Sequence, residues 1–246
     1  MLITFDGSFE GFLCIVYSYY YEKIRPVSIQ LEDECQQVLD AEEYYIATDY
    51  HKAVKVQKGI RKKISRQADA YITYAFLAGD GHMDLLRYII FGFKVGKIVD
   101  NHLQKDFVIN VHKKARYVAG EAHLLYGFCR FAETATGVFY CEISPKNNVL
   151  SILAEYFSDR MMNQAWVIHD TKRNRAAIYD GNRYVVEEVP RDVNVDICSK
   201  EGDIKDLWGA FFNALWIEER TNKALQRNML PLHFRKHMTE FNLTNP

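Results

Sequence analysis

Residues 120–131 read GEAHLLYGFCRF, and within this stretch the pattern changes from one typical of a helix to one typical of a strand. Before Gly127, apolar residues recur at the three- and four-residue spacing of an amphipathic helix. After it, residues 128–133 and 138–143 flank a Thr-Ala-Thr-Gly turn, which predicts a β-hairpin. Helices before this point and hairpin-joined strands after it predict an α+β fold, not a doubly wound parallel sheet.

The remainder of the chain extends this division. We expect a single domain, residues 1–246, in which a helix-rich half (1–127) packs with a mainly antiparallel sheet and C-terminal helices (128–246). The expected helices span about 9–20, 49–66, 68–77, 83–99, 105–126, 148–160 and 203–228. The expected strands span 2–5, 128–133, 138–143, 165–169, 176–179 and 184–189. Asp6-Gly7-Ser8 and Asp49 are typical helix-capping residues, whereas residues 25–48 show no readable pattern.

Composition places the chain among ordinary globular proteins. Of its 246 residues 48% are hydrophobic, which is enough to build a sizeable core. No apolar run reaches the roughly 20 residues that a membrane-spanning helix needs, so we expect no membrane association. The five cysteines form no Cys-x-x-Cys pair. We therefore expect a reduced, cytoplasmic chain without a metal site or cofactor.

Charge is strongly segregated along the chain, although the formal net charge is only −1. Residues 1–50 carry two basic and ten acidic side chains, whereas residues 51–116 carry fourteen basic and five acidic ones. Such segregation is typical of a surface that faces a polyanion. It equally fits an acidic first segment packed beside a basic second one.

The helix expected at 105–126 carries a polar row on one side of its apolar stripe. At 100° per residue, His112, Arg116 and His123 fall on one shoulder of the stripe, and Glu121 falls on the other. Glu121 and His123 are therefore not expected to form an acid–base pair. The row suits an anion such as phosphate better than a metal ion. The alternative is structural: the histidines bond to backbone groups, and the arginine covers apolar surface.

The helix expected at 49–66 carries seven cations and no carboxylate from Lys52 onward. We expect phosphate contacts from Lys58, Arg61 and Lys62, with Arg130 added from the first strand after Gly127. Part of this helix must nevertheless be a solvated face, because its cations point in several directions.

Two C-terminal patterns also carry polar candidates. If the helix at 203–228 is continuous, Glu219, Asn222 and Gln226 share the apolar stripe of Trp208, where polar groups need partners. If it ends near Glu219, the residues that follow are capping residues. His169-Asp170 ends a strand, where catalytic side chains occur but structural turns are commoner. No established catalytic motif is present.

Four blocks in this order resemble a bacterial family described as "probable DNA metabolism protein". They are residues 5–13 (FDGSFEGFL), residues 120–131, residues 168–170 (IHD) and the C-terminal residues 218–240 with EERTN, LQ and LP. The resemblance implies a role beside a radical SAM protein of DNA modification or repair. Some relatives are fused to a uracil-DNA glycosylase-like domain. This chain has no room for that domain and lacks the clustered cysteines of a radical SAM enzyme.

Three hypotheses follow. The first is an accessory protein in DNA repair or nucleic-acid modification that binds nucleic acid, expected to be DNA, or a radical SAM partner, or both. The second is a hydrolase or lyase acting on nucleic acid or nucleotides, with Glu121 or Glu219 as general base and His123, His169 and Asp170 assisting. The third is a purely structural partner-binding module that uses Tyr19–Tyr21 or the acidic first segment.

Overall fold

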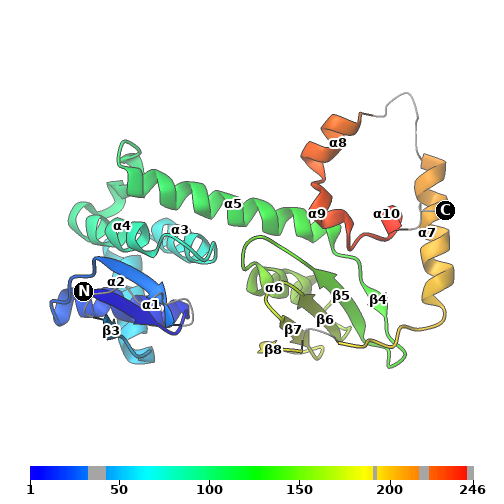
Figure 1. Cartoon of the computed structure of the whole chain (residues 1–246), viewed down its shortest axis with the longest axis horizontal. Helices are drawn as coiled ribbons and strands as arrows, with labels where there is room; N and C mark the ends of the chain where they lie inside the picture. The colour runs from blue at the N-terminus through cyan, green and yellow to red at the C-terminus, as the bar shows by residue number, and fades with distance from the viewer. Residues whose placement is uncertain (33–42, 191–192, 216–221, 243–246) are drawn as a thin grey trace. The chain divides into compact units, whose positions relative to one another are not determined.

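The computed structural model describes residues 1–32, 43–190, 193–215 and 222–242 (Figure 1). The chain forms two compact units, Met1–Ala119 and Gly120–Pro246. The boundary between the two units falls within α5 (Asp106–Phe128), the helix that enters the GEAHLLYGFCRF stretch. Helices and strands occur in both units, which confirms the predicted α+β class.

The first unit contains a three-stranded sheet with the order β2-β1-β3, and both strand pairs are parallel. All four residues of the central strand β1 (Leu2–Phe5) are buried, as expected for a strand with a partner on each side. Its partners β2 (Ser28–Leu31) and β3 (Glu43–Tyr45) come from residues 25–48, the part of the sequence without a readable pattern. They are short strands, and their partner lies far away in the chain.

Helices surround this sheet, and their capping residues explain where they begin. The helices are α1 (Phe9–Tyr21), α2 (Tyr50–Lys63), α3 (Arg66–Phe76), α4 (His82–Val95), the 3₁₀ helix η2 (Gly96–Asn101) and the first part of α5. The side chains of Ser8 and Asp49 accept hydrogen bonds from the first turns of α1 and α2, which confirms both predicted caps. The stripe predicted for α5 is also confirmed, because Val108, Val111 and Ala115 are buried.

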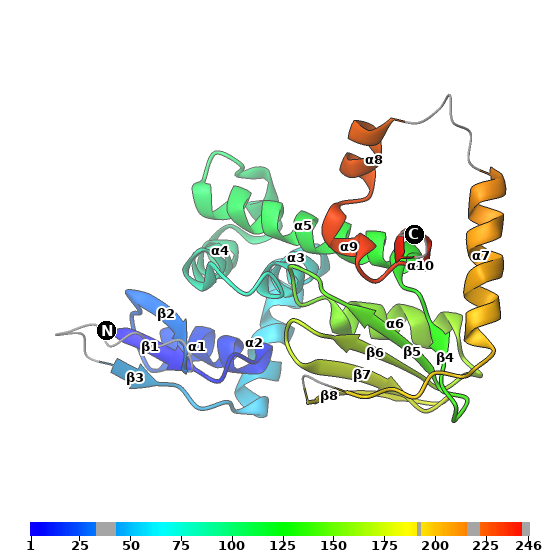
Figure 2. The ribbon, with the colours of Figure 1, turned by 45° about the vertical axis from the view of Figure 1, so that its right-hand side comes forward.

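The second unit contains a five-stranded sheet in chain order, shown in Figure 2. Its strands are β4 (Ala132–Glu133), β5 (Phe139–Ile143), β6 (Trp166–Asp170), β7 (Arg175–Tyr179) and β8 (Tyr184–Glu188). The β4–β5, β6–β7 and β7–β8 pairs are antiparallel, as predicted. β5 and β6 are parallel instead, because the chain crosses between them through the helix α6 (Leu150–Arg160).

The two faces of this sheet differ in character. On the face toward α6, Trp166 and Ile168 are fully buried, and the ring centroid of Trp166 lies 6.5 Å from that of Phe157. The opposite face carries Tyr140 of β5 and His169 of β6, whose polar atoms meet. Polar side chains of neighbouring strands therefore gather on the face opposite α6.

The C-terminal segment is built from shorter helices than predicted. They are α7 (Glu201–Leu215), α8 (Lys223–Met229), α9 (Leu232–Arg235) and α10 (Thr239–Asn242). A single helix over 203–228 is thus wrong, because Asn222 has extended backbone and caps a new helix. Among the described residues, no helix has the length and apolar character required to cross a membrane.

Candidate functional site

Polar side chains meet where the two parallel strands of the second unit end. Ser144 directly follows β5 and Thr171 directly follows β6, and the last residues of these strands, Ile143 and Asp170, are register partners. Ligands of open α/β sheets bind outside the carboxyl ends of parallel strands. The carboxyl end of the β5–β6 pair is therefore a candidate ligand-binding site.

Ser144 is held by two partners at this position. Its Oγ lies 2.7 Å from Oγ1 of Thr171 and 2.7 Å from Nε2 of His237, which lies between α9 and α10. The other ring nitrogen of His237 lies 3.6 Å from Oε2 of Glu142. Burial lowers the pKa of His237, against the raising effect of Glu142. The ring is therefore neutral at pH 7 and available as a hydrogen-bond acceptor.

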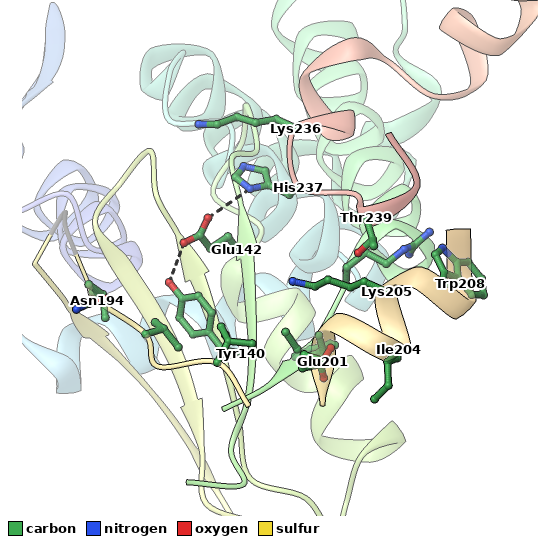
Figure 3. A pocket seen from close by; sticks show the side chains of 16 residues that line it. Tyr140, Glu142, Asn194, Glu201, Ile204, Lys205, Trp208, Lys236, His237 and Thr239 are labelled. Atoms are coloured by element: carbon green, nitrogen blue, oxygen red, sulfur yellow. Dashed lines mark hydrogen bonds and ion pairs between the residues drawn. The ribbon is translucent and has the colours of Figure 1, made fainter. Parts of the chain in front are cut away.

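Glu142 joins this group to a second one on the same face of the sheet, as Figure 3 shows for Tyr140, Glu142 and His237. The Tyr140 hydroxyl donates to Oε1 of Glu142 at 3.2 Å and lies 2.7 Å from Nδ1 of His169. Burial, followed by the charge of Glu142, raises the pKa of Tyr140, so its hydroxyl keeps its proton. His169 is 2% exposed, and its Nε2 has no hydrogen-bond partner among the described residues.

A cavity of about 680 Å³ opens beside this network (Figure 3). Glu142, Tyr140 and His237 line it together with α7, the segment 193–197 and Lys236. A second hollow of about 410 Å³ shares Tyr140 and residues 193–195 with it and contains His169. The cavity lining thus combines acid, imidazole, phenol and ammonium groups. Among the residues that the structure describes, no three His, Cys, Asp or Glu side chains are grouped to hold a metal ion.

Two of the predicted catalytic residues hold the loop that carries Ser144. Glu121 is buried, and its carboxylate accepts hydrogen bonds from the backbone of Lys146 and from the backbone and side chain of Asn147. Asp170 is fully buried and accepts from the backbone and guanidinium of Arg173, which in turn donates to the carbonyls of residues 145 and 146. Glu121 and Asp170 therefore converge on residues 144–147 as loop supports.

The other predicted catalytic residues are dispersed. His169 belongs to the Tyr140 network described above. His123 is exposed, and its ring lies 6.0 Å from that of Tyr126 in the same helix. Glu219 lies outside the described residues.

Three of the predicted nucleic-acid contacts come together in the first unit. Lys58, Arg61, Lys62, Arg66 and Asp69 line a surface hollow of about 510 Å³ where α2 gives way to α3, called here the cation hollow. Asp69 is mostly buried and pairs with Arg61, with 2.5 Å between Oδ2 and Nε. The other three cations are exposed and form no ion pair with a described residue.

The remaining predicted contacts are elsewhere. Nε2 of His112 lies 2.8 Å from Oδ1 of Asp100, so this ring faces a carboxylate and not an anion site. Arg116 is exposed in the first unit. Arg130 forms a two-point ion pair with Glu240, at 2.6 and 3.2 Å, and its guanidinium is therefore already neutralised.

The expected polar cluster on a core face is not formed by the described residues. Asn222 is exposed, and its side chain accepts from the backbone of Leu225 as a helix cap. Gln226 is half-buried one turn further on in α8. The stripe that they were expected to share is also not core, since Trp208 is 41% and Phe211 52% exposed.

Sequence reasoning missed most of the polar network. Ser144, Thr171 and His237 lie in no recognisable motif, and 93 residues separate the serine from the histidine. The available signal was positional, because Ser144 directly follows one predicted strand and Thr171 comes two residues after the end of another. These positions predict a common site only when the two strands are known to be parallel neighbours, because their carboxyl ends then lie side by side.

Comparison with models of protein families places most of the chain in a family. A family model described as a domain of unknown function, DUF4130, matches residues 80–240, from the end of the first unit through nearly all of the second. No curated protein and no solved structure matches the chain.

Proposed function

We propose that this chain, which belongs to the DUF4130 family of domains of unknown function, is an accessory protein that binds nucleic acid through its first unit. The cation hollow is the observation that carries the proposal. Lys58, Lys62 and Arg66 expose three positive charges at one turn, and the one carboxylate that lines the hollow is already bound to Arg61. Clustered, unpaired cations on one surface attract a phosphate backbone.

The local fold explains why these charges stay together. Val56, Ile60 and Ile64 are buried and fix one side of α2, so Lys58 and Lys62, one turn apart, share the solvent side. Ser65 caps α3 by accepting from the backbone of Ala68, which places Arg66 in the first turn of that helix. The positive end of the α3 dipole thus lies beside the cations and favours an anion.

The proposed ligand is DNA, and the proposed setting is repair or modification together with a radical SAM partner protein. This part of the proposal is supported by the four sequence blocks that resemble the DNA metabolism family. Backbone contacts of this kind carry no sequence information, so we expect binding without strong sequence preference.

Fluorescence anisotropy with labelled single-stranded and duplex DNA at several salt concentrations tests the proposal. We expect affinity to fall with salt, with a logarithmic slope of about −0.9 for each phosphate neutralised on the duplex. Replacing Lys58, Lys62 and Arg66 together with glutamine should remove up to about three units of that slope. The matched control replaces three exposed cations of the second unit, Lys200, Lys223 and Arg227, with glutamine. Salt-independent binding, or equal losses in both triple variants, would contradict the proposal.

The radical SAM partner is tested separately. Co-purification of the tagged chain with a radical SAM protein encoded by the same genome should survive nuclease treatment if the contact is direct. Complete loss of the partner after nuclease treatment would show that DNA alone connects the two proteins.

A further inference from the structure

Ser144 and His237 have the geometry of a nucleophile and its general base. Oγ of Ser144 lies 2.7 Å from Nε2 of His237, whose other ring nitrogen faces the Glu142 carboxylate at 3.6 Å. A hydroxyl bonded to a base that a third group orients is the arrangement of covalent hydroxyl catalysis. We propose that Ser144 is a nucleophile activated by His237 and that this site cleaves phosphate esters.

The hydrogen bonds assign the proton positions that this role requires. Ionised Glu142 only accepts, so Nδ1 of His237 carries the hydrogen and Nε2 presents its lone pair to the Ser144 hydroxyl. Because the Ser144 hydrogen goes to His237, the Thr171 hydroxyl donates its own hydrogen to Oγ of Ser144, which fixes the serine side chain. The 3.6 Å separation is longer than a hydrogen bond, and catalytic contacts of this kind tighten when substrate binds.

The surroundings of Ser144 favour an anionic substrate. Lys146 lies two residues after Ser144, Lys172 follows Thr171, and Lys236 precedes His237, and all three are exposed. Lys146 belongs to the loop that Glu121 holds, and Lys172 directly follows Thr171, so both residues belong to segments at this end of the sheet. Ammonium groups around a nucleophile suit phosphoryl transfer, in which charge is spread over several phosphate oxygens.

The backbone after Ser144 argues against an ordinary esterase. Acyl transfer commonly uses the N–H of the residue after the nucleophile to stabilise the oxyanion, and Pro145 has none. The next two N–H groups, of Lys146 and Asn147, are occupied by Glu121. Lys146 is thus the cationic side chain that this loop offers to a developing negative charge, which favours phosphate over carboxylic esters.

The proposed reaction has two balanced steps. Oγ of Ser144 attacks phosphorus, its proton passes to Nε2 of His237, and the bond from phosphorus to the leaving alcohol breaks as His237 returns that proton to the alkoxide. Water then attacks the phosphoserine, losing a proton to His237, and Ser144 regains its proton as phosphate is released. Glu142 acts as a positioning residue, because it orients His237 and balances its transient positive charge.

A fluorophosphonate probe tests the nucleophile in the full-length chain. The serine oxygen bonds to phosphorus, fluoride leaves, and the serine proton passes to His237. We expect one label per chain, located on Ser144 by peptide mass spectrometry, and lost in Ser144→Ala. Ser158→Ala is the matched control, because that hydroxyl donates only to a carbonyl of its own helix. Absence of label, or label on other residues alone, would overturn the proposal.

The role of His237 has its own readouts. His237→Ala should slow labelling by about 10²-fold or more, and added imidazole should restore part of the rate, which a merely misfolded variant would not show. In the wild type, the labelling rate should fall as pH drops through the lowered pKa of His237, which Glu142, Ser144 and Lys236 face. A rate that is unchanged in His237→Ala would overturn the assignment of the base.

Turnover of two chromogenic substrates then decides the ester class. We expect bis(p-nitrophenyl) phosphate to be hydrolysed and p-nitrophenyl butyrate to be a poor substrate, with both activities absent in Ser144→Ala. Preference for the carboxylic ester would overturn the phosphate assignment. The outcome is independent of DNA binding, because Lys58, Lys62 and Arg66 lie in the first unit and Ser144 lies in the second.

Discussion

Glu121 and Asn147 are joined by two hydrogen bonds at the loop that carries Ser144. Oε2 of Glu121 accepts from the side-chain amide of Asn147 at 2.6 Å and from its backbone N–H at 2.8 Å. Oε1 accepts from the backbone of Lys146 at 2.8 Å, and the carboxylate is buried. A residue that the sequence offered as a candidate general base is therefore the anchor of a loop.

The first prediction follows from this contact. Glu121→Ala leaves three partly buried donors without an acceptor, and we expect it to destabilise the second unit by about 3 kcal/mol. All three tryptophans of the chain lie in residues 120–246, so urea unfolding followed by tryptophan fluorescence reports on this unit. Glu155→Ala, at an exposed position of α6, is the control and should change stability little. A Glu121→Ala midpoint equal to that of the control would refute the anchoring role.

The second prediction separates Arg130 from the cations of the hollow. Burial disfavours the charge of Glu240, but hydrogen bonds from Arg130 and Trp208 hold its pKa below the usual value. Arg130→Ala leaves that carboxylate buried without its main partner, at a cost of about 3 kcal/mol in unfolding free energy. We expect the salt dependence of DNA binding to stay the same, in contrast to Lys62→Ala.

Two measurements on the same variants check this. Urea unfolding measures the loss of stability. Fluorescence anisotropy at several salt concentrations measures how steeply DNA affinity falls with salt. Arg130→Ala together with Glu240→Ala should restore part of the lost stability, because no unpaired buried charge remains. If DNA affinity depends less steeply on salt concentration in Arg130→Ala than in the wild type, Arg130 contacts the nucleic acid, which would contradict this prediction.

Local patterns in the sequence predicted local structure well. The buried stripe of α5 and the caps Ser8 and Asp49 depend on neighbours a few residues away. The apolar period of α7 was also readable, but period alone does not say what covers a helix. The exposed Trp208 and Phe211 show that a stripe predicts an apolar face and not its burial.

The candidate site depended on contacts that no local pattern contains. Ser144 meets Thr171 because β5 and β6 are parallel neighbours, and it meets His237 because the chain returns 93 residues later. His112 was expected near an anion, yet the acidic Asp100 approaches it from the 3₁₀ helix η2, outside the helix from which the expectation was drawn. A helical wheel predicts on which side of a helix each residue lies, but it does not predict which other elements pack against that side.

The third prediction concerns His82 and acid stability. Its ring lies among Phe5, Phe12 and Phe76, with centroids 5.4, 5.9 and 5.6 Å away. Burial lowers its pKa from 6.5 to about 4, with Lys114 adding to the shift and Asp80 opposing it. Between these values the unfolded chain binds the proton and the folded chain does not, so stability falls as pH drops from 6.5 to about 4. The loss should approach about 3 kcal/mol.

Urea unfolding by far-UV circular dichroism at a series of pH values measures this loss. His82→Phe, which suits the aromatic surroundings, should flatten the acid limb of the stability curve. His51→Gln replaces an exposed histidine of the same unit and should leave the limb as in the wild type. An acid limb that is equally steep in His82→Phe would assign the loss to other groups.

The fourth prediction tests how tightly the start of the chain is packed. The Asp6 carboxylate accepts from the backbone and hydroxyl of Ser8 and from the hydroxyl of Thr48, which ties the turn before α1 to the residues before α2. A Cβ on Gly11 would lie 2.7 Å from Oγ1 of Thr48 and closer still to Oδ1 of Asp6. Gly11→Ala therefore disrupts this network and should cost about 1–3 kcal/mol, despite the higher helix propensity of alanine.

Gly120 provides the matched comparison, since it is also helical and a Cβ there meets no atom within 4 Å. Gly120→Ala should gain about 0.5–1 kcal/mol from propensity alone. Amide hydrogen exchange of the α1 peptides measures the effect of Gly11→Ala. Urea unfolding followed by tryptophan fluorescence measures the effect of Gly120→Ala. We expect faster exchange over α1 only in Gly11→Ala. Equal protection in both variants would mean that the turn yields to the added methyl group, and that Asp6, Ser8 and Thr48 do not hold it rigidly.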